Sequence, residues 1–119
     1  MDPVAPDPVE WLVSRQEALT ALLPAAVRVH LEIGEVGRYA LISDDNRQVT
    51  IEAPGEARPD CRLRLSHEDF GRMARGEIDP DDVFYAGRIR AEGDLGLAIR
   101  VGRALTGRRV GRPRDRFMV

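Results

Sequence analysis

The segment that decides the fold is DPDDVFYAGRIRAEGDLGLAIRV, residues 79–101. It begins with an Asp-Pro pair that is typical of a helix cap and first turn, and alternating apolar and charged residues over 86–92 then predict a strand with one buried face. Gly93 breaks this strand, and Asp94 is placed to cap the helix that follows. One face of that helix is apolar, with Leu95, Ala98, Ile99, Gly102 and Leu105 at helical spacing.

Upstream of this segment the hydrophobic period changes from helical to strand-like. Apolar residues at three-to-four spacing predict a helix over residues 8–23, which Pro24 ends. A period of two, divided by turn residues, then predicts strands at 27–33, 39–42, 48–51 and 61–65. Ser66 is placed to cap a short helix that Gly76 closes. Three turns in succession favour an antiparallel meander.

Length and composition fit one α+β domain, which we expect to span residues 8–106. The chain has 119 residues, of which 43% are apolar and 32% charged, and this balance supports a single hydrophobic core. No apolar run approaches the ~20 residues that span a bilayer. The opening MDPVAPDPVE lacks the charged and apolar regions of a signal peptide, so a cytoplasmic location is expected.

Residues that could carry chemistry are few. All 18 basic residues are Arg, which excludes chemistry that needs a lysine amine. Cys61 is the single cysteine, and only His30 and His67 accompany it, so no zinc-ligand spacing exists. We expect both histidines to be solvated, His30 on the outward face of its strand. With no base placed to activate a nucleophile, the sequence predicts no catalytic residue, no metal site and no cofactor.

The charge is divided unevenly along the chain. Residues 1–99 hold 11 Arg against 19 Asp and Glu, whereas residues 100–119 hold 7 Arg and Asp115. Residues 107–119 lack periodicity and are predicted to form a flexible tail. Its arginines are candidates for contact with an anionic membrane surface, and the acidic body makes nucleic acid the less favoured partner. These arginines are Arg108, Arg109, Arg112, Arg114 and Arg116.

The order and spacing of these elements resemble the sterol-carrier-protein type 2 family. The resemblance rests on Gly87, Ile89, Gly93 and Asp94, on LSHEDFGRMARGEIDP at residues 65–80, and on the helix-then-sheet order before them. It implies a stand-alone bacterial member with a five-stranded, mostly antiparallel sheet covered on one face by helices. It also implies non-catalytic binding and transfer of a fatty acyl chain, a sterol or another lipid in a tunnel between the two layers.

Such a tunnel needs an apolar lining, for which eight residues are candidates. They are Leu41, Ile51, Phe70, Met73, Phe84, Leu97, Ile99 and Leu105. Met73 is favoured because its unbranched thioether adapts to variable ligands. The last helix, with small residues on its inner face, is expected to act as the gate.

The same eight residues could instead form an ordinary packed core. The alternative function is then an accessory or scaffold protein for enzymes that handle lipophilic intermediates such as isoprenoid quinones. Some bacterial relatives have that role, and a protein of this kind would have a filled core and no bound lipid.

Overall fold

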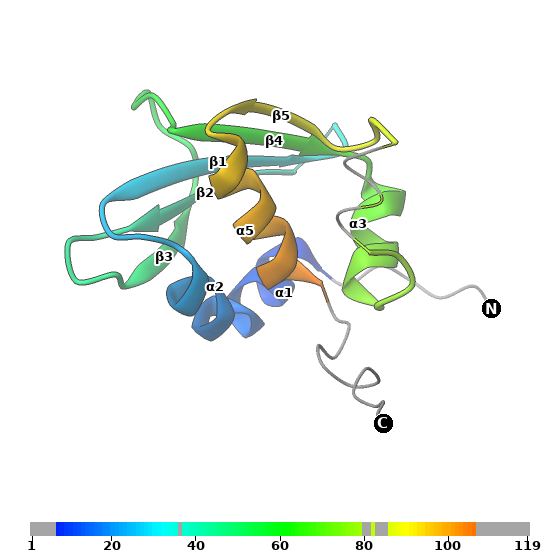
Figure 1. The fold of residues 1–119 in the computed structure, drawn as a ribbon, viewed down its shortest axis with the longest axis horizontal. Helices are drawn as coiled ribbons and strands as arrows, with labels where there is room; N and C mark the ends of the chain where they lie inside the picture. Colours follow the sequence, from blue (N-terminus) through cyan, green and yellow to red (C-terminus); the bar gives the residue numbers. More distant parts are fainter. Residues whose placement is uncertain (1–6, 36, 80–81, 83–85, 107–119) are drawn as a thin grey trace.

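The computed structural model describes residues 7–35, 37–79, 82 and 86–106. Within these ranges the chain forms two layers, a five-stranded sheet and a set of helices that lie on one of its faces (Figure 1). Phe84 and the arginines of the predicted 107–119 tail lie outside the described residues. The α+β class expected from the sequence is confirmed.

The sheet is mixed, and its central strand has one parallel neighbour. The strands are β1 (Val27–Ile33), β2 (Gly37–Ser43), β3 (Val49–Glu52), β4 (Cys61–Leu65) and β5 (Arg90–Gly93), in the order β3-β2-β1-β4-β5. β1 and β4 run parallel, and the other neighbouring pairs are antiparallel. The mostly antiparallel sheet is therefore confirmed. The expectation of an unbroken meander is wrong, because β4 pairs with β1 and not with β3.

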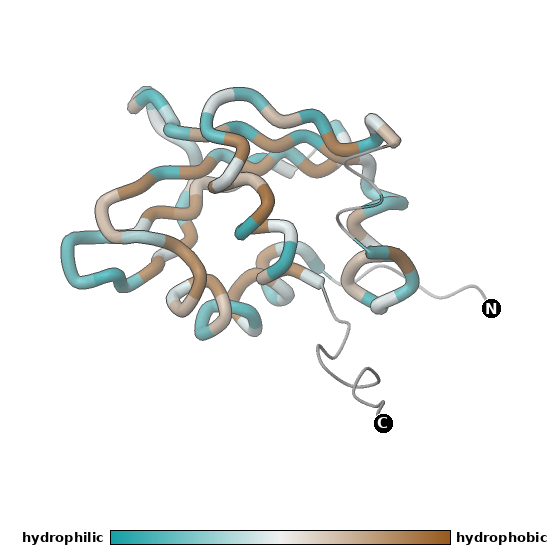
Figure 2. The backbone as a smooth tube through the Cα atoms, in the orientation of Figure 1, coloured by the Kyte–Doolittle hydropathy of each residue, from teal (hydrophilic) through white to brown (hydrophobic). Residues whose placement is uncertain are grey.

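Alternation along β1 divides the sheet into an apolar face and a polar face. Val29, Leu31 and Ile33 are buried toward the helices. Register places Val29 between Leu41 of β2 and Cys61 of β4, so apolar side chains form a row across the strands. Figure 2 shows the same alternation of hydrophobic and hydrophilic residues along the strands.

The helices within the described ranges are α1 (Pro8–Ser14), α2 (Gln16–Leu22), α3 (His67–Ala74) and α5 (Leu95–Leu105). Three of their N-termini carry the side-chain caps that the sequence indicates. Asp7 Oδ1 accepts from the Val9 N–H at 3.0 Å, Ser66 Oγ from Asp69 N–H at 2.9 Å, and Asp94 Oδ1 from Leu97 N–H at 3.1 Å. These bonds fix where α1, α3 and α5 begin.

Three expected boundaries or faces differ from the structure. The first helix is divided at Arg15, and β5 begins at residue 90 because Gly87, with φ of +75°, turns the chain before it. The buried face of α5 is rotated from the expected stripe. It consists of Leu97, Ala98, Val101, Gly102, Ala104 and Leu105, whereas Leu95 and Ile99 are 59% and 37% exposed. Apolar residues lie on two adjacent faces of α5 in the sequence. The face that packs against α2 and β4 is the buried one.

The junction between β5 and α5 depends on Gly93. Its φ is +94°, and a Cβ built there would overlap the carbonyl oxygen of Asp60. We expect Gly93→Ala to lower the free energy of unfolding by about 2 kcal/mol. An alanine there would be strained by the positive φ, and its Cβ would also clash with the backbone of Asp60. Urea unfolding followed by circular dichroism measures the change. Gly55→Ala is the control, since a Cβ at Gly55 meets no atom within 4 Å; equal effects of the two substitutions would contradict the prediction.

Candidate functional site

Seven of the eight predicted lining residues are described by the structure, and six of these lie between the sheet and the helices. Leu41, Phe70, Met73, Leu97 and Leu105 are buried in a single hydrophobic cluster. Ile51 is half-buried and packs against that cluster. Ile99 lies apart, on the solvent-facing side of α5. The described residues therefore gather six of the eight candidates in one apolar interior.

Helix α3 is attached to this interior mainly by side chains. It stands at one end of the sheet, beside the layer that α1, α2 and α5 form (Figure 1). Among the described residues its backbone approaches the other elements closely at few points, whereas α5 packs along α2 and β4. Phe70 and Met73 project into the cluster, and Thr106 Oγ1 donates to the Met73 carbonyl at 3.4 Å. Among the described residues, α3 thus has less backbone packing than α5.

An ion pair that the sequence did not indicate holds the other side of α3. The Asp69 carboxylate, 4% exposed, pairs with the Arg88 guanidinium. Asp69 looks like a helix-capping residue in the sequence, and its partner lies 19 residues away beyond a turn. A buried carboxylate needs such a partner, so removal of Arg88 would leave an uncompensated charge under α3.

The C-terminal end of α5 is fixed to α1 by two donors. Trp11 Nε1 donates to the carbonyl of Leu105 and Arg15 Nε to that of Ala104, each at 2.9 Å. The last carbonyls of a helix have no partner within the helix, so these bonds satisfy groups that would otherwise need water. The Arg15 guanidinium also lies 5.5 Å from the centre of the Trp11 ring. The expectation that α5 acts as a gate assumed that few side chains hold this helix, and these two hydrogen bonds hold its end in addition.

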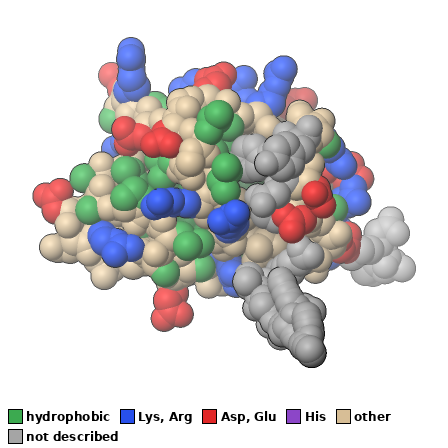
Figure 3. Space-filling model, viewed as in Figure 1, with side chains coloured by type: hydrophobic (Ala, Val, Ile, Leu, Met, Phe, Trp, Pro, Cys, Tyr) green, Lys and Arg blue, Asp and Glu red, His purple; other side chains and the backbone are tan. Residues whose placement is uncertain are grey.

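A basic notch lies where α2, α5 and the β2–β3 turn meet. Three arginines, Arg47, Arg100 and Arg103, surround a hollow of about 610 Å³ with the apolar end of α2. Arg47 Nη2 donates to the Ala21 carbonyl at 3.1 Å, and Arg100 Nη1 donates to a carbonyl of α2 at 3.4 Å. Figure 3 shows basic side chains among hydrophobic ones on the face that carries α5. No carboxylate lines this notch among the described residues.

Burial changes the pKa of two groups that are suited to chemistry, Cys61 and His30. Cys61 is buried, and burial first, with Asp94 and Asp60 next, raises its thiol pKa to about 11. His67 is exposed as expected, but His30 is only 7% exposed, which corrects the prediction of a solvated side chain. Burial, followed by the charges of Arg28 and Arg62, lowers the pKa of His30, so its neutral form is favoured.

Metal-ligand clusters and membrane-spanning helices were also sought in the described ranges. No group of three His, Cys, Asp or Glu side chains there could hold a metal ion. In the same ranges, no helix has both the length and the apolar character that crossing a bilayer requires.

Comparison with known proteins relates this arrangement to lipid carriers. The model of the SCP-2 sterol transfer family matches residues 10–106. The palmitated SCP2L2 protein of Aedes aegypti has a similar fold, with 20% identity, coverage of 82% of this chain and 93% of that chain, and a TM-score of 0.60. The UbiJ-SCP2 ubiquinone synthesis protein is similar at 14% identity, with coverage of 86% and 78% and a TM-score of 0.55.

A curated relative is similar over a shorter segment. The peroxisomal multifunctional enzyme type 2 of Mus musculus is 32% identical over 47 residues, which is 40% of this chain. The matched segment is 6% of that enzyme's length.

The raised pKa of Cys61 predicts slow thiol labelling. Because the thiolate is the reactive form, a pKa of about 11 makes the folded protein react with an aromatic disulfide reagent at least about 100-fold more slowly than the unfolded chain at pH 8. Absorbance of the released thiol, with and without urea, measures both rates. Rapid labelling without urea would contradict the buried position of Cys61.

Proposed function

The chain belongs to the SCP-2 sterol transfer family, and we propose that it binds an apolar ligand and sequesters or transfers it without catalysis. The ligand class is a fatty acyl chain, a sterol or another lipid. The observation that carries the proposal is the family match over residues 10–106, which encloses the whole apolar cluster between sheet and helices. Such a ligand needs a site lined mostly by hydrophobic side chains, and the residues of this cluster have that character.

We place the ligand between α3 and the α1–α5 layer. Phe70 and Met73 of α3 lie there in the same cluster as Leu97 and Leu105 of α5. Few backbone contacts hold α3, so it can move outward at lower cost than α5, whose end is bonded to α1. Displacement of α3 would open the cluster to a chain-like ligand. The Asp69–Arg88 ion pair would limit this displacement, because it attaches α3 to the segment before β5.

A fatty acyl chain is the ligand that one of the similar structures favours, since the Aedes aegypti protein is palmitated. The alternative role, as an accessory or scaffold protein for enzymes of lipophilic intermediates, is favoured by the likeness to the ubiquinone synthesis protein. The complete burial of Leu12, Leu19 and Leu41 is compatible with the packed core that this alternative requires. The two roles differ in whether purified protein carries a lipid.

Filling the space beside α3 should weaken ligand binding. We expect Met73→Trp to lower the affinity for a fluorescent fatty acid by about tenfold, because the indole would occupy the position of the acyl chain. Met73→Leu is the matched control, since it conserves side-chain volume and should leave the affinity nearly unchanged. Fluorescence titration gives the affinities, and thermal unfolding shows whether each variant is folded.

Native mass spectrometry of the purified wild-type protein completes this test. A retained lipid supports the carrier role. Absence of both retained lipid and fatty-acid binding in folded wild-type protein would refute the carrier proposal and favour the accessory role.

We further propose that the protein meets an anionic membrane through the basic notch and the arginines of residues 107–119. Leu22 and Ile99 are exposed on the elements that form the notch, so apolar and cationic side chains share one surface. α5 also leads directly toward residues 107–119. Each Arg close to an anionic surface contributes about 1 kcal/mol, which makes the combined attraction substantial at low salt.

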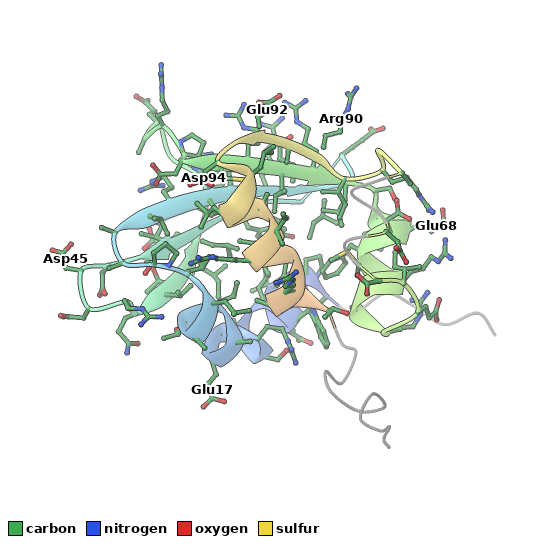
Figure 4. The ribbon with its side chains drawn as sticks, in the orientation of Figure 1. Glu17, Asp45, Glu68, Arg90, Glu92 and Asp94 are labelled. Carbon is green, nitrogen blue, oxygen red and sulfur yellow. The ribbon has the colours of Figure 1, made fainter. Side chains whose placement is uncertain are left out.

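Charge removal from the notch should weaken vesicle binding. We expect Arg100→Gln combined with Arg103→Gln to reduce binding to phosphatidylglycerol vesicles by about tenfold at low salt, with a smaller effect at high salt because of screening. Sedimentation with vesicles measures binding. Arg90→Gln is the control, because Arg90 points away from the helices on the opposite face of the sheet (Figure 4). An equal loss in the control would indicate that only net charge matters.

Deletion of residues 107–119 separates the tail from the notch in the same assay. Binding that is unchanged by both the deletion and the notch substitutions would contradict the proposed surface.

A further inference from the structure

The face of the sheet away from the helices carries an ordered polar row. His30 of β1 stands in register with Arg62 of β4, and Arg62 with Glu92 of β5. In Figure 4, Glu92 and Arg90 point away from the helical layer, in agreement with the register. This outer face is distinct from the apolar interior, because β-strand side chains alternate between the two faces.

The connection between β3 and β4 is forced across this outer face. β3 and β4 lie on opposite sides of the β2–β1 pair and run parallel to one another, and the helices cover the inner face. Residues 53–60 form the connection, here called the crossover loop. Its end is fixed where Asp60 accepts from the Arg28 N–H at 2.9 Å and donates its own N–H to the Arg28 carbonyl at 2.8 Å. The loop explains why His30 is buried on a polar face.

A pocket of about 540 Å³ lies between the crossover loop and the strands. Residues 54–59 form one wall, and the lining from the outer face includes His30, Glu32, Arg38 and Arg62. This volume falls within the range of small-molecule sites. Its lining is largely polar, so a ligand would be recognised by charge and hydrogen bonds.

Two nitrogen atoms at this pocket are buried without a hydrogen-bond partner among the described residues. They are His30 Nε2 and Arg62 Nε, and they come from residues in register on adjacent strands. Glu32 Oε2 lies 3.7 Å from Arg62 Nε, which is an ion pair but too long for a hydrogen bond. The other oxygen of Glu32 accepts from Arg64 at 3.1 Å. Buried polar atoms are nearly always satisfied, and an arginine Nε can only donate, so Arg62 indicates a missing acceptor. In the tautomer that carries its proton on Nε2, His30 can donate to the same acceptor.

The charges around the pocket favour an anion as that acceptor. Three arginines, Arg38, Arg58 and Arg62, line the pocket together with two glutamates, Glu32 and Glu56. Glu32 also pairs with Arg64 outside the pocket, and Arg62 Nη1 lies 3.7 Å from Glu92 Oε1. Among the described residues, Arg38 and Arg58 have no hydrogen-bond or ion-pair partner. Guanidinium groups pair well with the oxygens of phosphate and carboxylate.

We propose that the pocket under the crossover loop binds a phosphate-bearing small molecule, whose oxygens accept from Arg62, Arg38 and the imidazole of His30. Residues 54–59 of the crossover loop would lie against this ligand, because they form one wall of the pocket. The phosphate can belong to a free metabolite or to a lipid headgroup. This site is independent of the apolar interior and does not rest on lipid binding.

NMR of the His30 imidazole provides the test, with inorganic phosphate and phosphatidic acid vesicles as probes. The expected result is a saturable shift of the His30 ring signals and a rise in its pKa, because a bound anion opposes the effects of Arg28 and Arg62. A response to phosphate in solution identifies a soluble ligand, and a response to the vesicles alone identifies a headgroup.

Two substitutions in one cross-strand row make the test specific. Arg38 and Arg90 lie on the cross-strand row that contains Glu32 and Arg64. Of these two arginines, Arg38 lines the pocket and Arg90 does not. Arg38→Gln should weaken binding at least fivefold, and Arg90→Gln should change it less than twofold. Thermal unfolding checks that both variants are folded. The proposal is overturned if neither probe gives a saturable shift, as expected for a pocket that holds only water, or if both variants respond alike.

Discussion

The parallel pairing of β1 with β4 is the constraint on which the rest of the structure depends. It places β1 in the centre of the sheet, with hydrogen-bonded neighbours on both sides. It also requires the chain to cross the sheet between β3 and β4 on the face that the helices leave open. One face therefore receives α1, α2, α3 and α5 over an apolar row, and the other receives the crossover loop over a polar row. The two candidate sites, one apolar and one polar, therefore lie on opposite faces of the sheet.

Local features of the fold could be predicted from the sequence because neighbouring residues determine them. Asp7, Ser66 and Asp94 cap the helices as expected, and strands β1 to β4 begin and end close to their predicted limits. Features that depend on distant partners could not be predicted in this way. The position of β4 beside β1, the rotated face of α5 and the burial of His30 all result from contacts between segments far apart in the chain.

In the candidate lipid site, too, local features could be predicted from the sequence and long-range contacts could not. Apolar residues such as Met73 and Leu105 could be assigned to the interior because burial follows from their chemistry and spacing. The Asp69–Arg88 pair holds α3 and the Trp11 hydrogen bond holds the end of α5, and neither contact leaves a local signal in the sequence. The likeness to the SCP-2 family supplies the fold and the ligand class. The distribution of contacts then favours α3, and not α5, as the moving element.

The β1–β4 pairing also affects the chain while it is still folding. β1, β2 and β3 follow one another with short turns, so their pairing closes small loops at little entropic cost. Arg28 and Asp60, which are bonded at the start of the parallel pairing, are 32 residues apart, and such non-local contacts form slowly. Until β4 arrives, the apolar strand β1 is an open edge that another chain can extend by strand addition. β4 thus protects the nascent protein from aggregation as well as completing its sheet.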